Sequence, residues 1–557
     1  MQRPFLLSTP IFCLTALLCH SPDALAAPAS GTNDKPAAAA SATASNPVNT
    51  TTSAPANTSA ALSTEQQALH VLNRLAYGPK PGDVQYVQKI GVAAYIAQQL
   101  QPETIPLPAS LQQRLARLET EQAGSGQMLT AFREARQAAR SDNASDKQQA
   151  KEEAMHVAEQ RAEGRLLRAI DSPRQLEEVM VDFWYNHFNV YAGKGLDRAL
   201  ITSYERDAIR PYVLGNLRQL LGATAKHPAM LFYLDNWLST KAGYTAQRAL
   251  RFGLSPQKVK ASGLNENYAR ELMELHTLGV DGGYTQNDVT ELARMFTGWT
   301  FAARGGIDSN ELFRFDPLRH DNGSKIWLGK TVTANGQAEG EFALDVLAQH
   351  PATAKFISFK LAQYFVQDQP DAKLVQNLAQ VFLQNKGEIR PVLKALFASP
   401  GFLNASGSKF KTPYQFVVSA TRASAIPVEN IRPLLGTLQQ LGMPLYGSPT
   451  PDGYKNTEAA WLNPDALTRR IQFATALATG RLPLGQAPKN PTMSKKQLER
   501  QATPGEQALA QNSSADTAKL LATLGSSISP ATREIIQQQP ATLRAAMVLG
   551  SPDFMRH

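Results

Sequence analysis

The chain has 557 residues, of which 43% are hydrophobic, so it is long and apolar enough to bury a large core in one domain or in several. Its net charge is +9, and its two cysteines are Cys13 and Cys19. Both cysteines fall in a segment with the pattern of a signal peptide, so the mature chain would hold no disulfide, no thiolate metal site and no cysteine nucleophile.

Residues 1–26 are interpreted as a secretory signal peptide. Arg3 precedes an apolar stretch from Phe5 to Leu18, and Ala24-Leu25-Ala26 offers an Ala-x-Ala cleavage site. The apolar stretch is too short to span a bilayer comfortably, and no later stretch replaces it. We therefore expect export, to the periplasm or the outside, with no transmembrane segment in the mature chain.

The positive charge bears on the choice of partners. An exported basic protein would meet anionic glycans, lipid headgroups or acidic proteins rather than nucleic acid. The simpler interpretation, which we favour, is a soluble protein whose excess charge prevents self-association.

Beyond the signal, the chain is expected to divide into a linker, a helical domain and a C-terminal part. Residues 27–62 are almost entirely Ala, Ser, Thr, Pro, Asn and Gly, which predicts a disordered tether. Residues 64–484 repeat the apolar spacing of amphipathic helices, including a hairpin within Leu111 to Ile170 that breaks near Ser141. Residues 485–529 are predicted to be a polar linker, and residues 530–557 a C-terminal helix.

One stretch of the helical domain differs in character. Trp299 to Val332 mixes aromatic residues, glycines and short alternating runs, which predicts a small β-hairpin or an ordered loop. The expected fold class is therefore all-α, a large multi-helix single domain with a small irregular or β-hairpin insert.

Asn265 to Thr300 is the most informative segment. It reads NENYARELMELHTLGVDGGYTQNDVTELARMFTGWT, two amphipathic helices joined by a glycine-rich turn, with Thr285 placed to cap the second helix. The polar side chains of the first helix share one face, here called the charged face: Glu266, Asn267, Arg270, Glu271 and Glu274.

The charged face admits two interpretations. Arg270 lies four residues from both Glu266 and Glu274, a spacing that allows ion pairs. The favoured interpretation is a buried structural network that ties the two helices together, with Arg270 as its anchor. The alternative is acid–base catalysis, because burial would raise the pKa of these carboxyls toward neutrality. His276 falls on the apolar side of the helix and is interpreted as a core residue.

Two further clusters are candidates for a functional site. His320 and Asp321, with Lys325, lie in the irregular insert, where loop side chains held by a rigid scaffold often carry function. Asn186 and His187 stand where a helix is expected to end, and a helix C-cap is the simpler interpretation of that pair.

These clusters are expected to meet in space. We predict that Glu271 or Glu274 shares one cavity with His320 and Asp321, and that Asn186 and His187 supply a third wall. His320 and Asp321 could join the carboxylates in an oxygen- and nitrogen-ligated metal site, but the spacing matches no standard metal motif, so the cofactor stays unassigned.

Several long motifs, in order, resemble one bacterial family. Besides the segment above, they are MVDFWYNHFNVYAGK, YERDAIRPYVLGNLRQLLGATAKHPAMLFYLDN, RHDNGSKIWLG, HPATAKFISFKLAQYFVQDQP and KFKTPYQFVVSATRA. They resemble the family called domain of unknown function 1800, from about Thr64 to about Leu484. The family has no established reaction. Its members often appear to be encoded beside proteins that look like sulfatases and alkaline phosphatases, which implies a partner of that kind.

Two classes of function follow. The favoured one is an accessory or partner protein for the assembly, export or processing of cell-envelope or extracellular material. The alternative is an envelope or secreted enzyme, an acid–base or metal-assisted hydrolase that uses the polar clusters above. The sequence has no G-x-G-x-x-G, Walker or G-x-S-x-G motif, which disfavours a nucleotide enzyme or a common serine hydrolase.

Overall fold

The computed structural model describes residues 62–244, 263–302, 312–486 and 514–557, which belong to the unit Ala61–His557. The predicted signal peptide and nearly all of the predicted linker lie outside the described residues. Within these ranges the chain consists of helices and two small antiparallel sheets of two strands each. The predicted all-α class with a small β insert is confirmed. None of the described helices combines the length and the apolar character needed to cross a bilayer.

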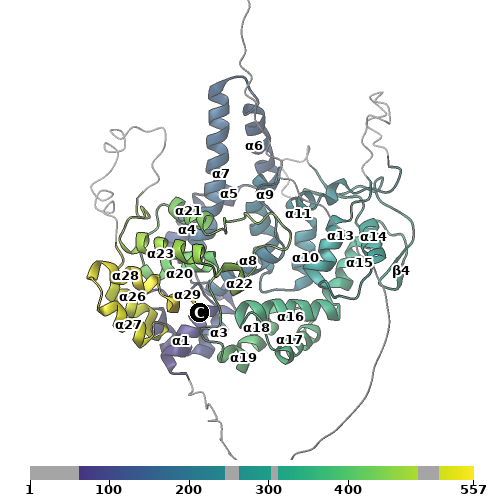
Figure 1. The fold of residues 1–557 in the computed structure, drawn as a ribbon. Coiled ribbons are helices and arrows are strands. Elements are labelled where there is room, and N and C mark those ends of the chain that lie inside the picture. The colour runs from purple at the N-terminus through teal and green to yellow at the C-terminus, as the bar shows by residue number, and fades with distance from the viewer. Residues whose placement is uncertain (1–61, 245–262, 303–311, 487–513) are drawn as a thin grey trace, which may run out of the picture. The chain divides into compact units, whose positions relative to one another are not determined.

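The N-terminal part is a series of helices that ends in a long helical hairpin (Figure 1). In chain order its elements are α1 (Thr64–Arg74), α2 (Asp83–Ile90), α3 (Val92–Gln99), η1 (Pro102–Thr104), α4 (Ala109–Ala116), α5 (Glu119–Gln122), α6 (Ser125–Ala138) and α7 (Ala144–Asp171). The predicted break near Ser141 is present, and Asn143 begins α7 by accepting the N–H of Ser145 at 2.9 Å. The first arm of the predicted hairpin is divided among α4, α5 and α6.

The central part surrounds α8, whose Trp184 is wholly buried and donates its indole N–H to the carbonyl of Val213 at 2.9 Å. Its elements are α8 (Gln175–His187), α9 (Asp197–Ser203), η2 (Tyr204–Ile209), η3 (Arg210–Tyr212), α10 (Leu217–Lys226), α11 (Pro228–Tyr233), η4 (Asn236–Leu238), α13 (Asn267–Glu271), η6 (Leu272–Thr277) and α14 (Gln286–Met295). Two of them, η2 and η6, are π-helical turns, a geometry that is frequent at functional sites.

The insert forms two short hairpins, as the mixed composition of this stretch predicts. Its strands are β1 (Trp299–Phe301), β2 (Phe313–Phe315), β3 (Lys325–Trp327) and β4 (Lys330–Val332). Trp299 pairs with Phe315 across the first hairpin, and Lys325 pairs with Val332 across the second. Trp299 and Trp327 are almost completely buried, so both hairpins are anchored to the helical core by their aromatic side chains.

The C-terminal part returns to helices, and one continuous core includes residues from α1 through α29. Its elements are α15 (Gln337–Ala348), α16 (Pro351–Phe365), α17 (Ala372–Gln384), α18 (Ile389–Phe397), α19 (Pro400–Leu403), α20 (Pro413–Ser424), α21 (Arg432–Gln440), α22 (Glu458–Trp461), α23 (Pro464–Ala478), α26 (Thr517–Leu524), η7 (Gly525–Ser527), α27 (Pro530–Gln537), α28 (Ala541–Leu549) and α29 (Pro552–Met555).

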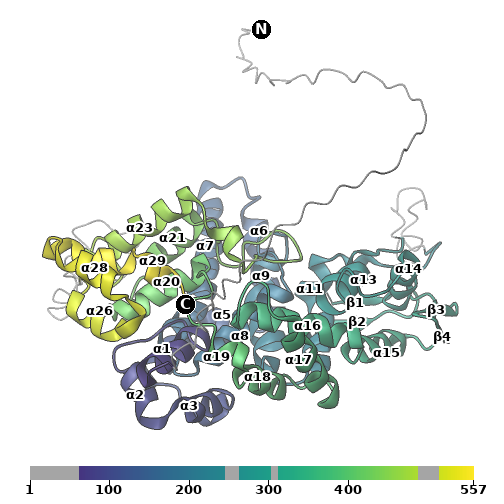
Figure 2. The ribbon, with the colours of Figure 1, turned by 60° about the horizontal axis from the view of Figure 1, so that its bottom comes forward.

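This part differs from the expected linker and single terminal helix. The end of the predicted linker, 485–529, contains α26, and the predicted terminal helix, 530–557, is three helices. Ser529 and Ser551 cap α27 and α29, and a proline follows each cap. Because α28 packs against α23, these helices share the core of the preceding ones (Figures 1 and 2).

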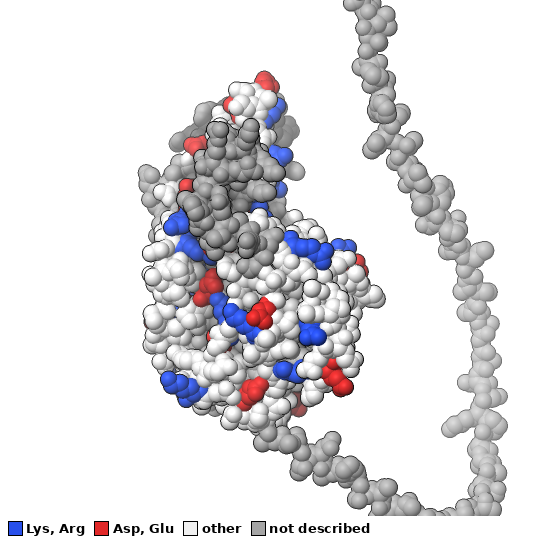
Figure 3. All heavy atoms as spheres, turned by 90° about the vertical axis from the view of Figure 1, so that its left-hand side faces the viewer, with Lys and Arg blue, Asp and Glu red and all other residues white. Residues whose placement is uncertain are grey.

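The face around α23 and α26–α28 illustrates how the charge is distributed (Figure 3). Lys and Arg side chains lie scattered over it among Asp and Glu. Arg469 and Asp465, for example, form an exposed ion pair at 2.7 Å on α23. On this face the charges are dispersed rather than gathered.

The end of the chain is held by backbone pairing with the segment before α20. Lys409 and His557 exchange backbone hydrogen bonds at 3.2 and 2.9 Å, and the N–H of Lys411 donates to the carbonyl of Met555 at 2.9 Å. The Lys411 side chain is buried, with its ammonium 3.9 Å from the ring centre of Phe554. Burial, with the nearby Arg470 guanidinium, lowers the pKa of Lys411 to about 7.

Lys411→Met should therefore change how stability depends on pH. The folded-state pKa lies below the unfolded value, so the unfolded chain binds more protons between pH 7 and 10.5 and stability rises across that window. One proton contributes at most about 1.4 kcal/mol per pH unit. Urea unfolding at a series of pH values should show a shallower rise for the variant. An identical slope in the two proteins would contradict the assignment.

Candidate functional site

A polar cavity of about 310 Å³ lies against α8 and is here called the His187 cavity. It is lined by Asp182, Phe183, Asn186, His187, Glu274, Leu275, Val280, Phe356, Phe359, Lys360, Gln363, Tyr364, Thr412, Met443, Asp452, Tyr454, Lys455, Asn456 and Thr457. These residues come from α8, η6, α16, the start of α20 and the segment 443–457. A concave site with polar groups from several elements is the usual form of a ligand site.

The segment 443–457 has no helix or strand, so its backbone is held by side chains of α8 and the residues after it. Asn186 accepts the N–H of Tyr454 and donates to the carbonyl of the same residue, both at 2.7 Å. Asn189 donates to the carbonyls of Ser448 and Thr450 at 3.0 and 2.8 Å. Asn186 is therefore a positioning residue that fixes one wall of the cavity, not a helix C-cap.

Gly453 is required at this contact. Its φ is +65°, and a Cβ there would lie 2.4 Å from the carbonyl oxygen of Asn186. Glycine alone accepts both the left-handed backbone and the close approach.

His187 is buried among aromatic rings, and one of its nitrogens has no partner within the described ranges. Its Nε2 lies 3.1 Å from the carbonyl oxygen of His276, which can only accept, so Nε2 carries the proton. Nδ1 is then an unprotonated acceptor, and it is buried without a hydrogen bond. Burial, with Lys360 and His276 nearby, holds the pKa of His187 well below its usual value, so the ring is neutral.

Lys360 and Glu274 place two charged groups on the cavity wall. Among the described residues, neither the ammonium of Lys360 nor the carboxylate of Glu274 has a hydrogen-bond or ion-pair partner. The ammonium of Lys360 lies 5.8 Å from the ring centre of Phe356. Burial lowers the pKa of Lys360, and the Lys455 ammonium lowers it further, whereas the Asp452 carboxylate raises it.

Carboxylates gather around Glu274. Burial raises the pKa of Glu271, and the Glu274 and Asp452 carboxylates raise it further. Asp452 itself is paired with Lys455 at 2.7 Å. Glu271 and Glu274 thus lie near one another and near the segment 443–457, although Glu271 is not among the residues that line the cavity.

Behind the cavity, Asp182 belongs to a buried ionic network. Its carboxylate lies 2.5 Å from the guanidinium of Arg165, which also binds Glu205 at 2.8 Å. Burial raises the pKa of Asp182. Although burial would also raise the pKa of Glu205, the guanidiniums of Arg165 and Arg210 hold it below the usual value. Asp182 therefore lines the cavity and is also held in this ionic network.

The charged face predicted from the sequence is a half-exposed network between α13 and α14. Glu266 accepts hydrogen bonds from Arg270, Gln286 and Thr290 at 3.2, 2.8 and 2.7 Å. The predicted pair between Arg270 and Glu274 is not formed, because the π-helical turn from Leu272 carries Glu274 to the cavity instead. Asn267 is exposed. The face ties the two helices together, as the favoured interpretation expects, but it does so near solvent.

Arg270→Ala should therefore have a small effect. The side chains of Arg270 and Glu266 are 39% and 31% exposed, so solvent screens their pair. We expect a loss below about 1 kcal/mol in the free energy of unfolding, measured by urea titration. A loss of several kcal/mol would mean that the face is desolvated.

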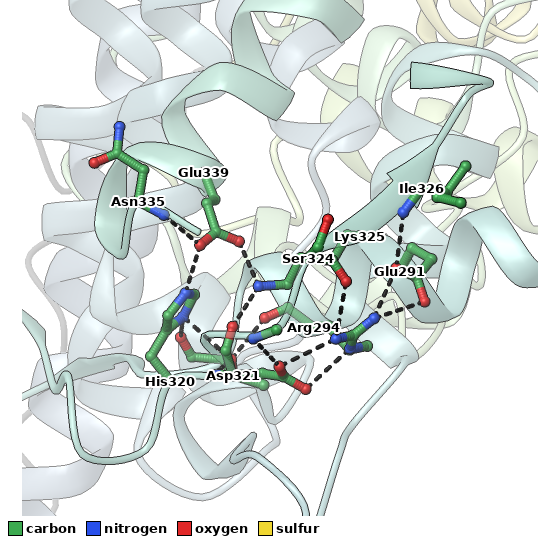
Figure 4. A network of polar contacts seen from close by, with 11 residues as sticks. Glu291, Arg294, His320, Asp321, Ser324, Lys325, Ile326, Asn335 and Glu339 are labelled. Carbon is green, nitrogen blue, oxygen red and sulfur yellow. Dashed lines mark hydrogen bonds and ion pairs between the residues drawn. The ribbon is translucent and has the colours of Figure 1, made fainter. Parts of the chain in front are cut away.

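His320 lies in a different network, which is fully buried (Figure 4). Its Nδ1 is 2.8 Å from the carbonyl oxygen of Thr297, and its Nε2 is 2.9 Å from the carboxylate of Glu339. Glu339 also accepts from Lys325 at 2.6 Å and from the N–H of Asn335 at 2.8 Å. These contacts attach the insert to α15.

Asp321 points the other way, toward α14. Its carboxylate accepts hydrogen bonds from the guanidinium of Arg294 at 2.9 and 3.1 Å, and Arg294 also binds Glu291 (Figure 4). The prediction that His320 and Asp321 share a cavity with Glu271 or Glu274 is wrong. The physical reason is that buried Lys325 and irregular backbone at the insert require their own carboxylates, and Glu339 and Asp321 supply them.

Glu339→Gln should be far more damaging than Arg270→Ala. It leaves the buried ammonium of Lys325 without a carboxylate, a change that costs about 3–5 kcal/mol. Hydrogen bonds from His320 and Lys325 hold the pKa of Glu339 below its usual value despite burial. The stabilisation by the Glu339 carboxylate is therefore present above the pKa that this group has in the unfolded chain. It is lost as pH falls through the pKa that the group has in the folded protein.

Urea unfolding at pH 7 and at progressively lower pH would check this. The difference between the wild type and Glu339→Gln should shrink on acidification. A difference below about 1 kcal/mol at pH 7 would contradict a desolvated ion pair.

Sequence reasoning found Asn186, His187 and Glu274 but missed Lys360, Tyr364 and the segment 443–457. A signal for that segment exists. PDGYKN (451–456) combines turn residues with Asp and Lys in a long stretch without regular structure, which is typical of functional loops. Lys360 was hidden, because a single lysine in an apolar helix is not informative until its surroundings are known. In the part of the chain that the structure describes, no three His, Cys, Asp or Glu side chains gather to hold a metal ion.

Comparison with known families confirms the resemblance seen in the sequence. A family model described as "Protein of unknown function (DUF1800)" matches residues 70–556, which includes the C-terminal helices as well as the expected domain. Neither a curated protein nor a solved structure matches the chain.

Proposed function

Because the chain belongs to the DUF1800 family, whose function is unknown, we propose a function from the site itself. The protein is an exported accessory protein of cell-envelope or extracellular material, and it binds an anionic sugar unit of that material in the His187 cavity. Export is supported by the signal-peptide pattern of residues 1–26.

The ammonium of Lys360, which has no ion-pair partner among the described residues, carries the proposal. It lines a cavity large enough for one sugar unit, and no described carboxylate is paired with it. A carboxylate, sulfate or phosphate ester would supply the missing counter-charge. An anionic group of this kind also fits the implied association with sulfatase- or phosphatase-like proteins.

The other free groups favour a ligand with hydrogen-bond donors. The Nδ1 of His187 and the carboxylate of Glu274 can only accept, so they suit hydroxyl or amine groups beside the anion. Sugar acids and sulfated sugars carry both kinds of group on one ring. Neutral sugars lack the anion, and simple anions lack the donors.

Titration of the purified protein with glucuronate, glucose 6-sulfate and glucose, followed by ligand NMR, tests the proposal. The two anionic sugars should bind more tightly than glucose, and Lys360→Met should remove that preference, about tenfold in affinity or 1.4 kcal/mol. Affinity for the anions should fall as pH rises through the lowered pKa of Lys360, because the ammonium is lost.

Lys355→Met is the matched control, since Lys355 is exposed on the same helix and does not line the cavity. The variant at Lys360 should fold normally, because it removes a half-buried charge that has no partner. Equal binding of glucose and the anionic sugars, or equal effects of the two variants, would refute the proposal.

A second candidate function is catalysis on the same ligand. It is favoured by one observation: His187 is neutral and has an unpartnered Nδ1, the state required of a general base, in the cavity that Glu274 also lines. Cleavage of an acidic oligosaccharide by the wild type, abolished in His187→Gln with binding retained, would select this function. Binding without turnover would select the accessory role.

A further inference from the structure

A second and larger cavity, of about 620 Å³, opens between the hairpin helices α6 and α7 and the segment 444–447. We call it the hairpin cavity. Its walls are mostly small or apolar, with Met128 and Phe132 on α6, Val157 and Ala158 on α7, and Leu445 opposite them. Its volume falls within the range of roughly 300–1,000 Å³ that small-molecule sites occupy.

Arg161 is the charge that distinguishes this cavity from a packing defect. Its Nη1 donates to the carbonyl of Arg198 at 3.0 Å, and its guanidinium lies 5.5 Å from the ring centre of Tyr446. Its Nε is buried and has no hydrogen-bond partner within the described ranges. Among those residues, no carboxylate is paired with Arg161.

The neighbouring arginine on the same helix shows what a satisfied site looks like. Arg165, four residues on, holds the carboxylates of Asp182 and Glu205 at 2.5 and 2.8 Å. Arg161 has an aromatic neighbour of the same kind but no anion. Burial lowers the pKa of Arg161, and the nearby Arg198 lowers it further, as expected for a cation without a counter-charge.

The remaining charges at the cavity lie at its edge. Arg198 and Glu153 line it, but both side chains are exposed. The only charge with a buried donor group is therefore positive, and the surface around it is apolar.

We propose that the hairpin cavity binds a single-chain amphiphile with a carboxylate head, such as a fatty-acid anion. The alkyl chain lies between α6 and α7. Its binding there is favourable by about 25 cal/mol for each Å² of apolar surface removed from water. The carboxylate pairs with Arg161, whose planar fork matches two carboxylate oxygens. A cationic head would be repelled by the guanidinium of Arg161, and a neutral head would leave the charge of that group without a counter-charge. This site is separate from the proposed sugar site and does not rest on it.

Isothermal titration calorimetry of the mature protein with dodecanoate, dodecyltrimethylammonium and dodecyl maltoside, each below its micelle concentration, tests the proposal. Dodecanoate should bind at least tenfold more tightly than the other two. Arg161→Met should weaken dodecanoate binding at least tenfold and leave dodecyl maltoside unchanged. Ala158→Trp, which fills the cavity, should abolish binding of all three.

Arg136→Met is the control, because Arg136 is exposed on α6 and does not line the cavity. Arg161→Met should keep the melting temperature of the wild type, since it removes a charge that has no carboxylate partner. Three results would overturn the proposal: no dodecanoate binding, equal binding of the anionic and cationic amphiphiles, or equal effects of the Arg161 and Arg136 variants. Binding to phosphatidylglycerol vesicles without binding of monomeric dodecanoate would instead identify a membrane-contact surface, and would also overturn it.

Discussion

The arrangement of both cavities depends on the contacts that the guanidinium of Arg165 makes. It lies within 5.2–5.4 Å of the ring centres of Tyr185, Tyr414 and Tyr446 and binds the carboxylates of Asp182 and Glu205. A planar, permanently charged fork can satisfy two carboxylates and stack on aromatic rings at the same time, which a lysine cannot do.

The contacts of Arg165 join α7, α8, η2 and the segment 443–457. Glu205 continues the network to Arg210, which binds Glu178 through both oxygens at 2.8 and 3.0 Å. Loss of one member would leave a buried charge unpaired, so every member contributes to the stability of the network. The network therefore fixes the position of a wall in both cavities, because the segment 443–457 lines each of them.

Tyr446 shows how firmly the shared segment is held. Its φ is +57°, a backbone conformation that residues other than glycine rarely adopt. Its ring lies on Arg165, and its hydroxyl donates to Glu205 at 2.9 Å. The strained conformation persists because these contacts fix it, and strain of this kind is concentrated at functional sites.

The sequence by itself determined the family, the fold class and many local structures. The 3.6-residue apolar spacing specified the helices, and polar capping residues specified the break before α7 and the cap at Thr285, because such features depend on residues close together in the chain. It also marked Asn186, His187 and Glu274. Only the tertiary structure decided which charges are compensated. Glu339 takes up the charge of Lys325, whereas Lys360 and Arg161 have no described anion. Compensation depends on residues far apart in the chain, and periodicity carries no information about such pairs.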